Sequence, residues 1–251
     1  MKWLKRHPFP VVAKLEQVVA LSFAFPESVL RPMVPDGLEI DTFGNYGFVT
    51  VSLVRTRKLR PAVFPECLGQ DFFLAGYRIF TRLRDDSGRR LRGLKILGSE
   101  TDKRRMVWLG NLMTGYRYRQ VKWVSITQGT ETHLRTMDRN DRLTLDIAYD
   151  DPKADTPLPS ASPFPDQRTA RRFAGPMPFT FSPDGERRFV VIEGNRTDWT
   201  PRPVEVKHWQ VALFDTPPFE DVQPILANAF AVDDIPYRWS KGRLVHAGGD
   251  A

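Results

Sequence analysis

The stretch that decides the fold runs from Leu91 to Trp123, LRGLKILGSETDKRRMVWLGNLMTGYRYRQVKW. Its first part, Leu91 to Leu97, alternates and is rich in Leu and Ile, which is typical of a half-buried strand. Gly98 and Ser99 follow and are expected to end that strand. An apolar face at helical spacing then predicts a helix over residues 103–113. The stretch therefore predicts a strand, a polar loop, a short helix and a second strand.

Strand patterns continue on both sides of this stretch, whereas helical patterns are few. Besides residues 103–113, only residues 27–33 and 166–174 predict helices. Further strands are predicted over residues 14–25, 38–41, 48–55, 72–83, 120–128, 133–137, 142–149, 178–181, 189–195, 204–215, 225–233, 236–239 and 243–246, with a loop at 55–69. Strands at such short spacing favour a mainly β (α+β) fold, with an antiparallel sheet or barrel that encloses a cavity.

The length of 251 residues fits one large β domain or two smaller ones. The segment from Asp150 to Pro165, DDPKADTPLPSASPFP, is rich in Pro, Ser and Asp. It has the composition of a domain linker or of a long crossing loop. We prefer a connection between two halves of one sheet system, so that residues 1–251 form a single domain.

The net charge of +7 and the sequence pI near 9.7 permit two kinds of partner, a nucleic acid or a small anion in a basic cavity. The basic residues occur in short pairs across the whole chain, and no zinc-finger, RRM or helix-turn-helix signature is present. We therefore expect a small anionic organic ligand and no nucleic acid. Homo-oligomer formation is left open by the sequence.

Several other classes of protein receive no support from the residues. No apolar run approaches the roughly 20 residues of a membrane span, and no secretory signal follows the basic start. Cys67 is the single cysteine, which fits a cytoplasmic protein. The four histidines lie far apart, and nucleotide or dinucleotide motifs are absent, so we predict neither a metal nor a cofactor.

Three bases, Lys103, Arg104 and Arg105, follow Asp102 in the loop of the deciding stretch. Runs of charge usually face water, so a solvated basic turn is one interpretation. The other interpretation is a nucleophilic Lys103, because a lysine attacks a carbonyl only when neutral and an adjacent cation such as Arg104 favours the neutral form. Asp102 acts in the opposite direction.

Two segments resemble the acetoacetate decarboxylase superfamily. Residues 25–41, FPESVLRPMVPDGLEID, resemble its early LRxxVPxxLEID segment and are still more similar to an uncharacterised bacterial branch. Residues 213–237, LFDTPPFEDVQPILANAFAVDDIPY, resemble its closing segment, in which an LFD motif precedes apolar strands. The resemblance implies an antiparallel cone-like β-barrel with an interior cavity and a lysine Schiff base.

The resemblance also implies site residues. The reactive lysine of the family lies in a Pro-Lys-Lys motif after a strand, and Asp102-Lys103-Arg104 occupies about that place. Lys103 would be the amine and Arg104 its neighbouring cation, with Glu66 or Glu100 as acid and base. The chain departs from the motif at the proline and at the second lysine, and the uncharacterised branch generally keeps no lysine there. The resemblance thus implies the fold more strongly than the activity.

Two functions follow from these residues. We expect a barrel that binds a small keto-acid or acyl-type anion without catalysis. The alternative is a lysine Schiff-base enzyme, similar to a decarboxylase or to an aldolase or dehydratase, acting on a small keto acid. The position of Lys103 distinguishes the two, since catalysis requires that it point into a closed cavity beside Arg104.

Overall fold

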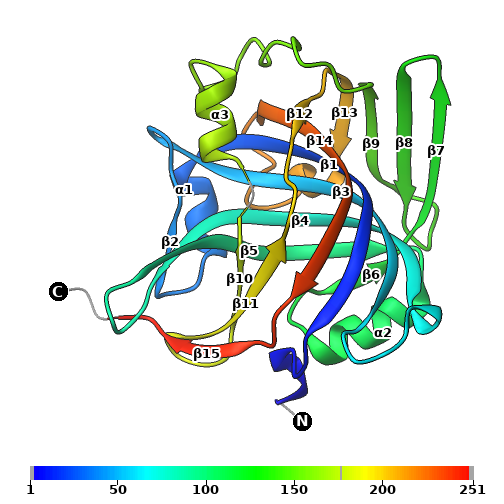
Figure 1. Ribbon diagram of the computed structural model, residues 1–251. Helices are drawn as coiled ribbons and strands as arrows, with labels where there is room; N and C mark the ends of the chain where they lie inside the picture. Colours follow the sequence, from blue (N-terminus) through cyan, green and yellow to red (C-terminus); the bar gives the residue numbers. More distant parts are fainter. Residues whose placement is uncertain (1–2, 176, 249–251) are drawn as a thin grey trace.

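A computed structural model describes residues 3–175 and 177–248 (Figure 1). The larger of two sheets has eleven strands. They are β1 (Val11–Pro26), β2 (Leu38–Ile40), β3 (Tyr46–Pro61), β4 (Gln70–Arg84), β5 (Arg90–Thr101), β6 (Tyr118–Gln120), β10 (Phe179–Pro183), β11 (Arg188–Arg196), β12 (Arg202–Pro203), β14 (Ile225–Trp239) and β15 (Arg243–His246). The smaller sheet holds β7 (Lys122–Gln128), β8 (Glu131–Met137), β9 (Leu143–Asp150) and β13 (Val206–Val211).

Helices are short and lie at the ends of the larger sheet (Figure 1). They are α1 (Glu27–Leu30), α2 (Arg104–Met113), α3 (Gln167–Phe173) and the 3-10 turns η1 (Leu4–Arg6), η2 (Arg31–Met33), η3 (Glu66–Leu68) and η4 (Ala212–Asp215). In the view of Figure 1, α3 covers the top of the sheet, and α2 lies at the bottom beside the β3–β4 connection. None of the described helices is long and apolar enough to cross a membrane. The mainly β prediction is confirmed.

The larger sheet curves until its strands meet again. Its strands follow the order β14, β1, β3, β4, β5, β10, β11, and β11 pairs in turn with β14, from Gly194 opposite Trp239 to Arg196 opposite Tyr237. One face of the sheet is therefore turned inward. The expectation of an antiparallel sheet was wrong, because β5 pairs in parallel with both β6 and β10. The chain leaves β5 and returns only after long crossovers, which parallel pairing requires.

The outward face of the larger sheet packs on the smaller sheet. Phe23 of β1 is fully buried there, with its ring 4.9 Å from that of Trp209 and 5.0 Å from that of Phe214. On the inward side, Phe48 stacks on Phe164 at 5.2 Å, and Phe173 of α3 packs beside both rings. This aromatic cluster closes one end of the space inside the sheet.

Most predicted elements are confirmed, and the differences concern their ends. Gly98 and Ser99 do not end the strand, because β5 continues to Thr101 through a bulge. The expected loop at 55–69 begins later, since β3 continues to Pro61. The last part of the strand expected at 204–215 is η4 instead. The predicted helices at 27–33, 103–113 and 166–174 are present, and 150–165 holds no regular element beyond the last residue of β9.

Candidate functional site

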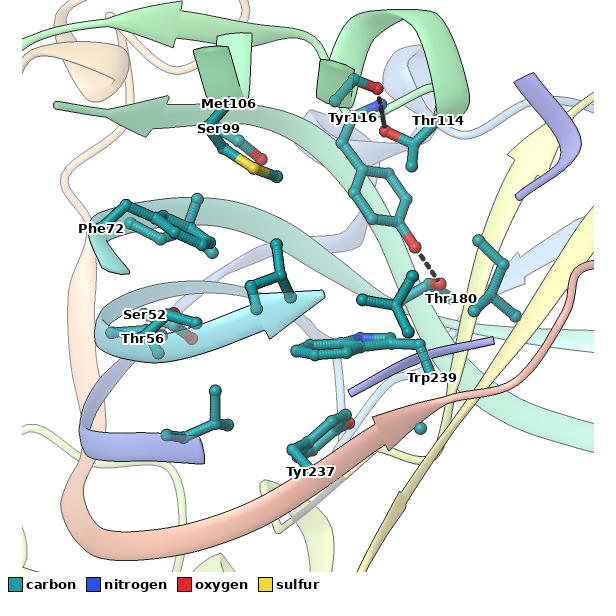
Figure 2. Close-up of a pocket in the computed structure, with 18 of the residues that line it drawn as sticks. Ser52, Thr56, Phe72, Ser99, Met106, Thr114, Tyr116, Thr180, Tyr237 and Trp239 are labelled. Atoms are coloured by element: carbon teal, nitrogen blue, oxygen red, sulfur yellow. Dashed lines mark hydrogen bonds between the residues drawn. The ribbon is translucent and has the colours of Figure 1, made fainter. Parts of the chain in front are cut away.

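The inward face of the larger sheet lines a cavity with a volume of about 1430 Å³ (Figure 2). Alternate residues of the strands supply its walls, as the two-residue period of a strand requires. On β3 they are Thr50, Ser52, Val54 and Thr56. The mouth is formed by the connection after β3 and by α2, since exposed residues of both segments line the cavity. The closed end lies at the aromatic cluster below α3.

Arg78 of β4 places a positive charge inside this cavity. Its Nη1 donates a hydrogen bond to Ser52 Oγ at 3.1 Å, and it forms no ion pair within the described part of the chain. Burial lowers the pKa of Arg78, an effect that the nearby hydroxyls of Tyr237, Tyr118 and Tyr116 partly oppose. Removing such a charge from water lowers the stability of the folded protein unless a group of opposite charge or a hydrogen-bond partner offsets the loss.

A glycine makes room for this guanidinium. Gly76 lies two residues before Arg78 on the same face of β4. A Cβ at Gly76 would lie 2.8 Å from Nη2 of Arg78, closer than unbonded atoms approach each other. A larger residue at position 76 would therefore require the Arg78 side chain to move.

Hydroxyl groups surround the same region of the cavity. The hydroxyl of Tyr116 lies 2.7 Å from Oγ1 of Thr180, as Figure 2 shows, and burial raises the pKa of Tyr116 to about 12. Tyr237 lies beside Trp239 on β14, with ring centroids 4.4 Å apart. The hydroxyl groups supply donors and acceptors, and Tyr116 does not cancel the charge of Arg78 because it stays neutral at physiological pH.

Arg196 is a second, partly buried cation of the lining. Its guanidinium lies over the ring of Trp199, 4.6 Å from the centroid, and Nη1 donates to the hydroxyl of Tyr237 at 3.5 Å. Burial lowers the pKa of Arg196. Two carboxylates of the lining are already bonded to other groups: Asp71 pairs with Arg57 at 2.9 Å, and Asp102 accepts from the Phe73 amide. Neither of these two carboxylates forms an ion pair with Arg78 or Arg196 in the described part of the chain.

The structure does not bring the four residues predicted from sequence together. Lys103 and Arg104 do lie side by side at the mouth of the cavity. The side chain of Lys103 is 51% exposed, and its Nζ lies 3.1 Å from Oδ2 of Asp102. Arg104 is also exposed. This is an open and charged setting rather than a closed, dry one, and the roles assigned to both residues stay predictions.

The two predicted acids lie away from that pair. Glu66 of η3 is exposed and pairs with Lys58 at 3.2 Å, outside the cavity lining. Glu100 is buried on the opposite face of β5 from Ser99, where it accepts hydrogen bonds from Tyr77 at 3.1 Å and Thr144 at 3.0 Å. Burial raises the pKa of Glu100, although these hydroxyls and the charge of Arg119 act in the opposite direction. Glu100 therefore joins the two sheets and lies outside the cavity lining, and its role as an acid or base stays a prediction.

The sequence contained a signal for Arg78 that our sequence analysis did not use. Phe72, Leu74, Gly76, Arg78 and Phe80 share one face of a predicted strand. A single arginine among apolar residues on such a face is out of pattern, and out-of-pattern residues concentrate at functional sites. Arg196, Tyr116 and Tyr237 offered no comparable signal, because their roles depend on contacts between distant strands.

A lysine that the sequence analysis did not propose is buried elsewhere. Lys95 of β5 donates from Nζ to the carbonyl oxygen of Ile96 at 2.8 Å. Burial, helped by the charge of Arg117, lowers the pKa of Lys95 to about 8. Its neighbours Leu94 and Ile96 line the cavity, whereas Lys95 itself is not part of the lining. A ligand in the cavity therefore does not meet this amine.

Comparison with a family model decides the family. The model DUF2071, described as an uncharacterized conserved protein, matches residues 12–233. The chain belongs to DUF2071. None of the curated proteins matches this DUF2071 chain. The sequence resemblance to an uncharacterised branch is thereby confirmed.

Solved structures show that this DUF2071 chain has the acetoacetate decarboxylase fold. Acetoacetate decarboxylase from Legionella pneumophila is 12% identical with a TM-score of 0.61, over 96% of this chain and 88% of that one. An acetoacetate decarboxylase-like enzyme from Sphingomonas wittichii is 11% identical with a TM-score of 0.59, over 97% and 95%. The enduracididine biosynthesis enzyme MppR complexed with pyruvate is 10% identical with a TM-score of 0.54, over 96% and 90%. At these identities the likeness concerns the fold.

Proposed function

We propose that this DUF2071 protein is a binding protein for an organic carboxylate, held inside the cone-like barrel that the curved sheet forms. The observation that carries the proposal is Arg78, a partly buried cation that faces the cavity and has a hydroxyl partner but no acidic one among the described residues. A carboxylate that accepts two hydrogen bonds from the guanidinium supplies the missing counter-charge. The hydroxyls of Tyr116 and Thr180 offer further partners to its polar end.

Two further observations support a carboxylate over other anions. The cavity walls are mainly apolar beyond the polar groups around Arg78, which suits an organic molecule rather than an inorganic ion. MppR, which shares the fold, is complexed with pyruvate, and pyruvate carries a carboxylate. Carboxylate binding by this chain is therefore consistent with both the cavity and the fold.

The proposal is tested by comparing carboxylic acids with their amides in thermal unfolding. A ligand that binds only the folded state raises the unfolding temperature with increasing concentration. We expect decanoate to raise the unfolding temperature of the wild-type protein, and decanamide, which has the same shape without the charge, to raise it far less. Equal shifts for the acid and the amide would remove the electrostatic basis of the proposal.

The alternative is a Schiff-base enzyme, and the fold favours it because the decarboxylase and MppR are enzymes. This alternative requires a neutral lysine amine that faces the cavity. Lys103 is exposed and paired with Asp102, and Lys95 does not line the cavity. We therefore propose binding without an imine as the main function.

Reduction with borohydride tests this alternative directly. An imine between a lysine and acetoacetate would be reduced to a stable secondary amine, seen as a mass increase on one peptide. We expect no single lysine to be labelled at neutral pH. Specific labelling that Lys103→Ala abolishes, and that Lys95→Ala leaves unchanged, would establish the enzyme instead. Labelling that only Lys95→Ala abolishes would show that the amine outside the cavity is the reactive one.

A further inference from the structure

The cavity is much larger than a keto acid requires. Its volume of about 1430 Å³ exceeds the roughly 300–1,000 Å³ of usual small-molecule sites. Pyruvate or acetoacetate bound at Arg78 would fill only a small part of that space and leave apolar walls facing water. The size of the cavity therefore points to a ligand with a substantial apolar part.

The lining changes in character between Arg78 and the mouth. Ser52, the hydrogen-bond partner of Arg78, lies opposite Gly76 of β4. Six residues before Gly76, at the start of β4, Gln70 lies opposite Leu59 at the mouth. At about 3.3 Å per strand residue, this path is roughly 20 Å long. Its walls include Leu74 and Phe72 of β4 and Met106 of α2; Figure 2 labels Phe72 and Met106.

The mouth itself carries exposed apolar side chains. Val63 is 85% exposed, Phe64 is 50% exposed and Leu68 is 64% exposed, and all three belong to the cavity lining. Apolar residues gathered on a surface mark an interaction site more often than isolated ones do. Here they continue the apolar wall from the interior to the surface, which gives the end of an apolar tail a place to lie.

Basic residues stand beside these apolar side chains. Lys103, Arg104 and Arg105 at the start of α2 all line the mouth. Positive charge at the opening of a low-dielectric cavity raises the local concentration of anions and speeds their binding. The basic run of the sequence thus attracts an anionic ligand to the mouth, which requires no reaction at Lys103.

We propose that the ligand is a free long-chain aliphatic acid, bound with its carboxylate at Arg78 and its tail extending to the mouth between Val63, Phe64 and α2. This inference rests on the proposed carboxylate binding and adds the tail. The polarity of the walls sets the orientation of the ligand. Arg78 lies inside the cavity, whereas the exposed apolar residues lie at its mouth. An ester or thioester has no negative charge to pair with Arg78, so we expect it to bind more weakly than the free acid.

Calorimetric titration with acetate, hexanoate, decanoate and dodecanoate, each below its micelle concentration, tests the tail. Each methylene removed from water adds up to roughly fourfold in affinity, so that affinity rises along the series. We expect methyl decanoate to bind at least tenfold more weakly than decanoate. A series with no dependence on length, in which acids still exceed their amides, would overturn the long tail and leave carboxylate binding intact. A series in which amides and methyl esters bind as well as acids would overturn both.

Two variants locate the tail. Leu74→Trp fills the path midway, and we expect it to abolish dodecanoate binding while acetate binding is kept. Phe64→Asp changes an exposed residue of the mouth without touching the core, and we expect it to weaken dodecanoate several-fold and hexanoate little. Equal affinities of Phe64→Asp and wild-type protein for dodecanoate would place the tail elsewhere and overturn the assignment, whether or not Leu74→Trp folds.

Discussion

Arg78→Met is expected to weaken the binding of decanoate by about 2–4 kcal/mol, which is roughly 30-fold to 1,000-fold in the dissociation constant. Arg78 supplies the buried cation of the cavity, and methionine keeps much of its volume without the charge. The carboxylate would then lose both its hydrogen bonds to the guanidinium and its counter-charge in a mainly apolar cavity. Calorimetric titration of the variant and the wild-type protein measures the difference.

The same substitution is expected to stabilise the ligand-free protein by about 1 kcal/mol, because it removes a partly buried charge that has no ionic partner among the described residues. Chemical denaturation without ligand measures this gain.

Arg84→Met, at the exposed end of the same strand, is the matched control and should change neither binding nor stability appreciably. Arg78→Lys should retain part of the affinity, since it keeps the charge and loses the paired hydrogen bonds. Unchanged decanoate binding by Arg78→Met would show that Arg78 does not bind the carboxylate.

Phe23→Ala is expected to lower the free energy of unfolding by about 3–5 kcal/mol. Phe23 is fully buried between the two sheets, where its ring meets those of Trp209 and Phe214 edge to face. Truncation removes these contacts and leaves a cavity that two sheets fixed by their own hydrogen bonds cannot close. Urea denaturation followed by intrinsic fluorescence gives the change.

The matched control is Phe64→Ala, in which the same side chain is removed from the half-exposed mouth of the cavity. We expect this variant to lose less than about 1 kcal/mol, because surface substitutions leave packing intact. A loss of under about 1 kcal/mol in Phe23→Ala would show that the smaller sheet is not held to the larger one by this aromatic contact.

The secondary structure was largely predictable, because its signals are local. The alternation in residues 72–83 and the apolar periodicity of 103–113 each depend on neighbours a few positions away, and β4 and α2 are present. The errors occurred where local signals are weak. Gly98 and Ser99 look like a strand end, yet β5 continues because pairing with β4 through a bulge satisfies their backbone groups.

The site was less predictable, because it depends on which faces meet. The basic run at Lys103 was prominent in the sequence, and it lies at the mouth of the cavity with its charge exposed. Glu100 differs from Ser99 by a single position, and that position alone sends it to the opposite face, where it bonds to Tyr77 and Thr144. Which face is the cavity and which is the core is decided only when distant strands pair.

By itself the sequence determined that this chain is mainly β, which segments become strands and short helices, and that it belongs to DUF2071. Only the tertiary structure decided that β11 returns to pair with β14, and hence that one face of the sheet encloses a cavity. The same closure places Arg78 of β4 among tyrosines from the α2–β6 segment and β14 and separates it from every described acid. Periodicity is a property of neighbouring residues, whereas the isolation of a buried charge is a property of everything packed around it.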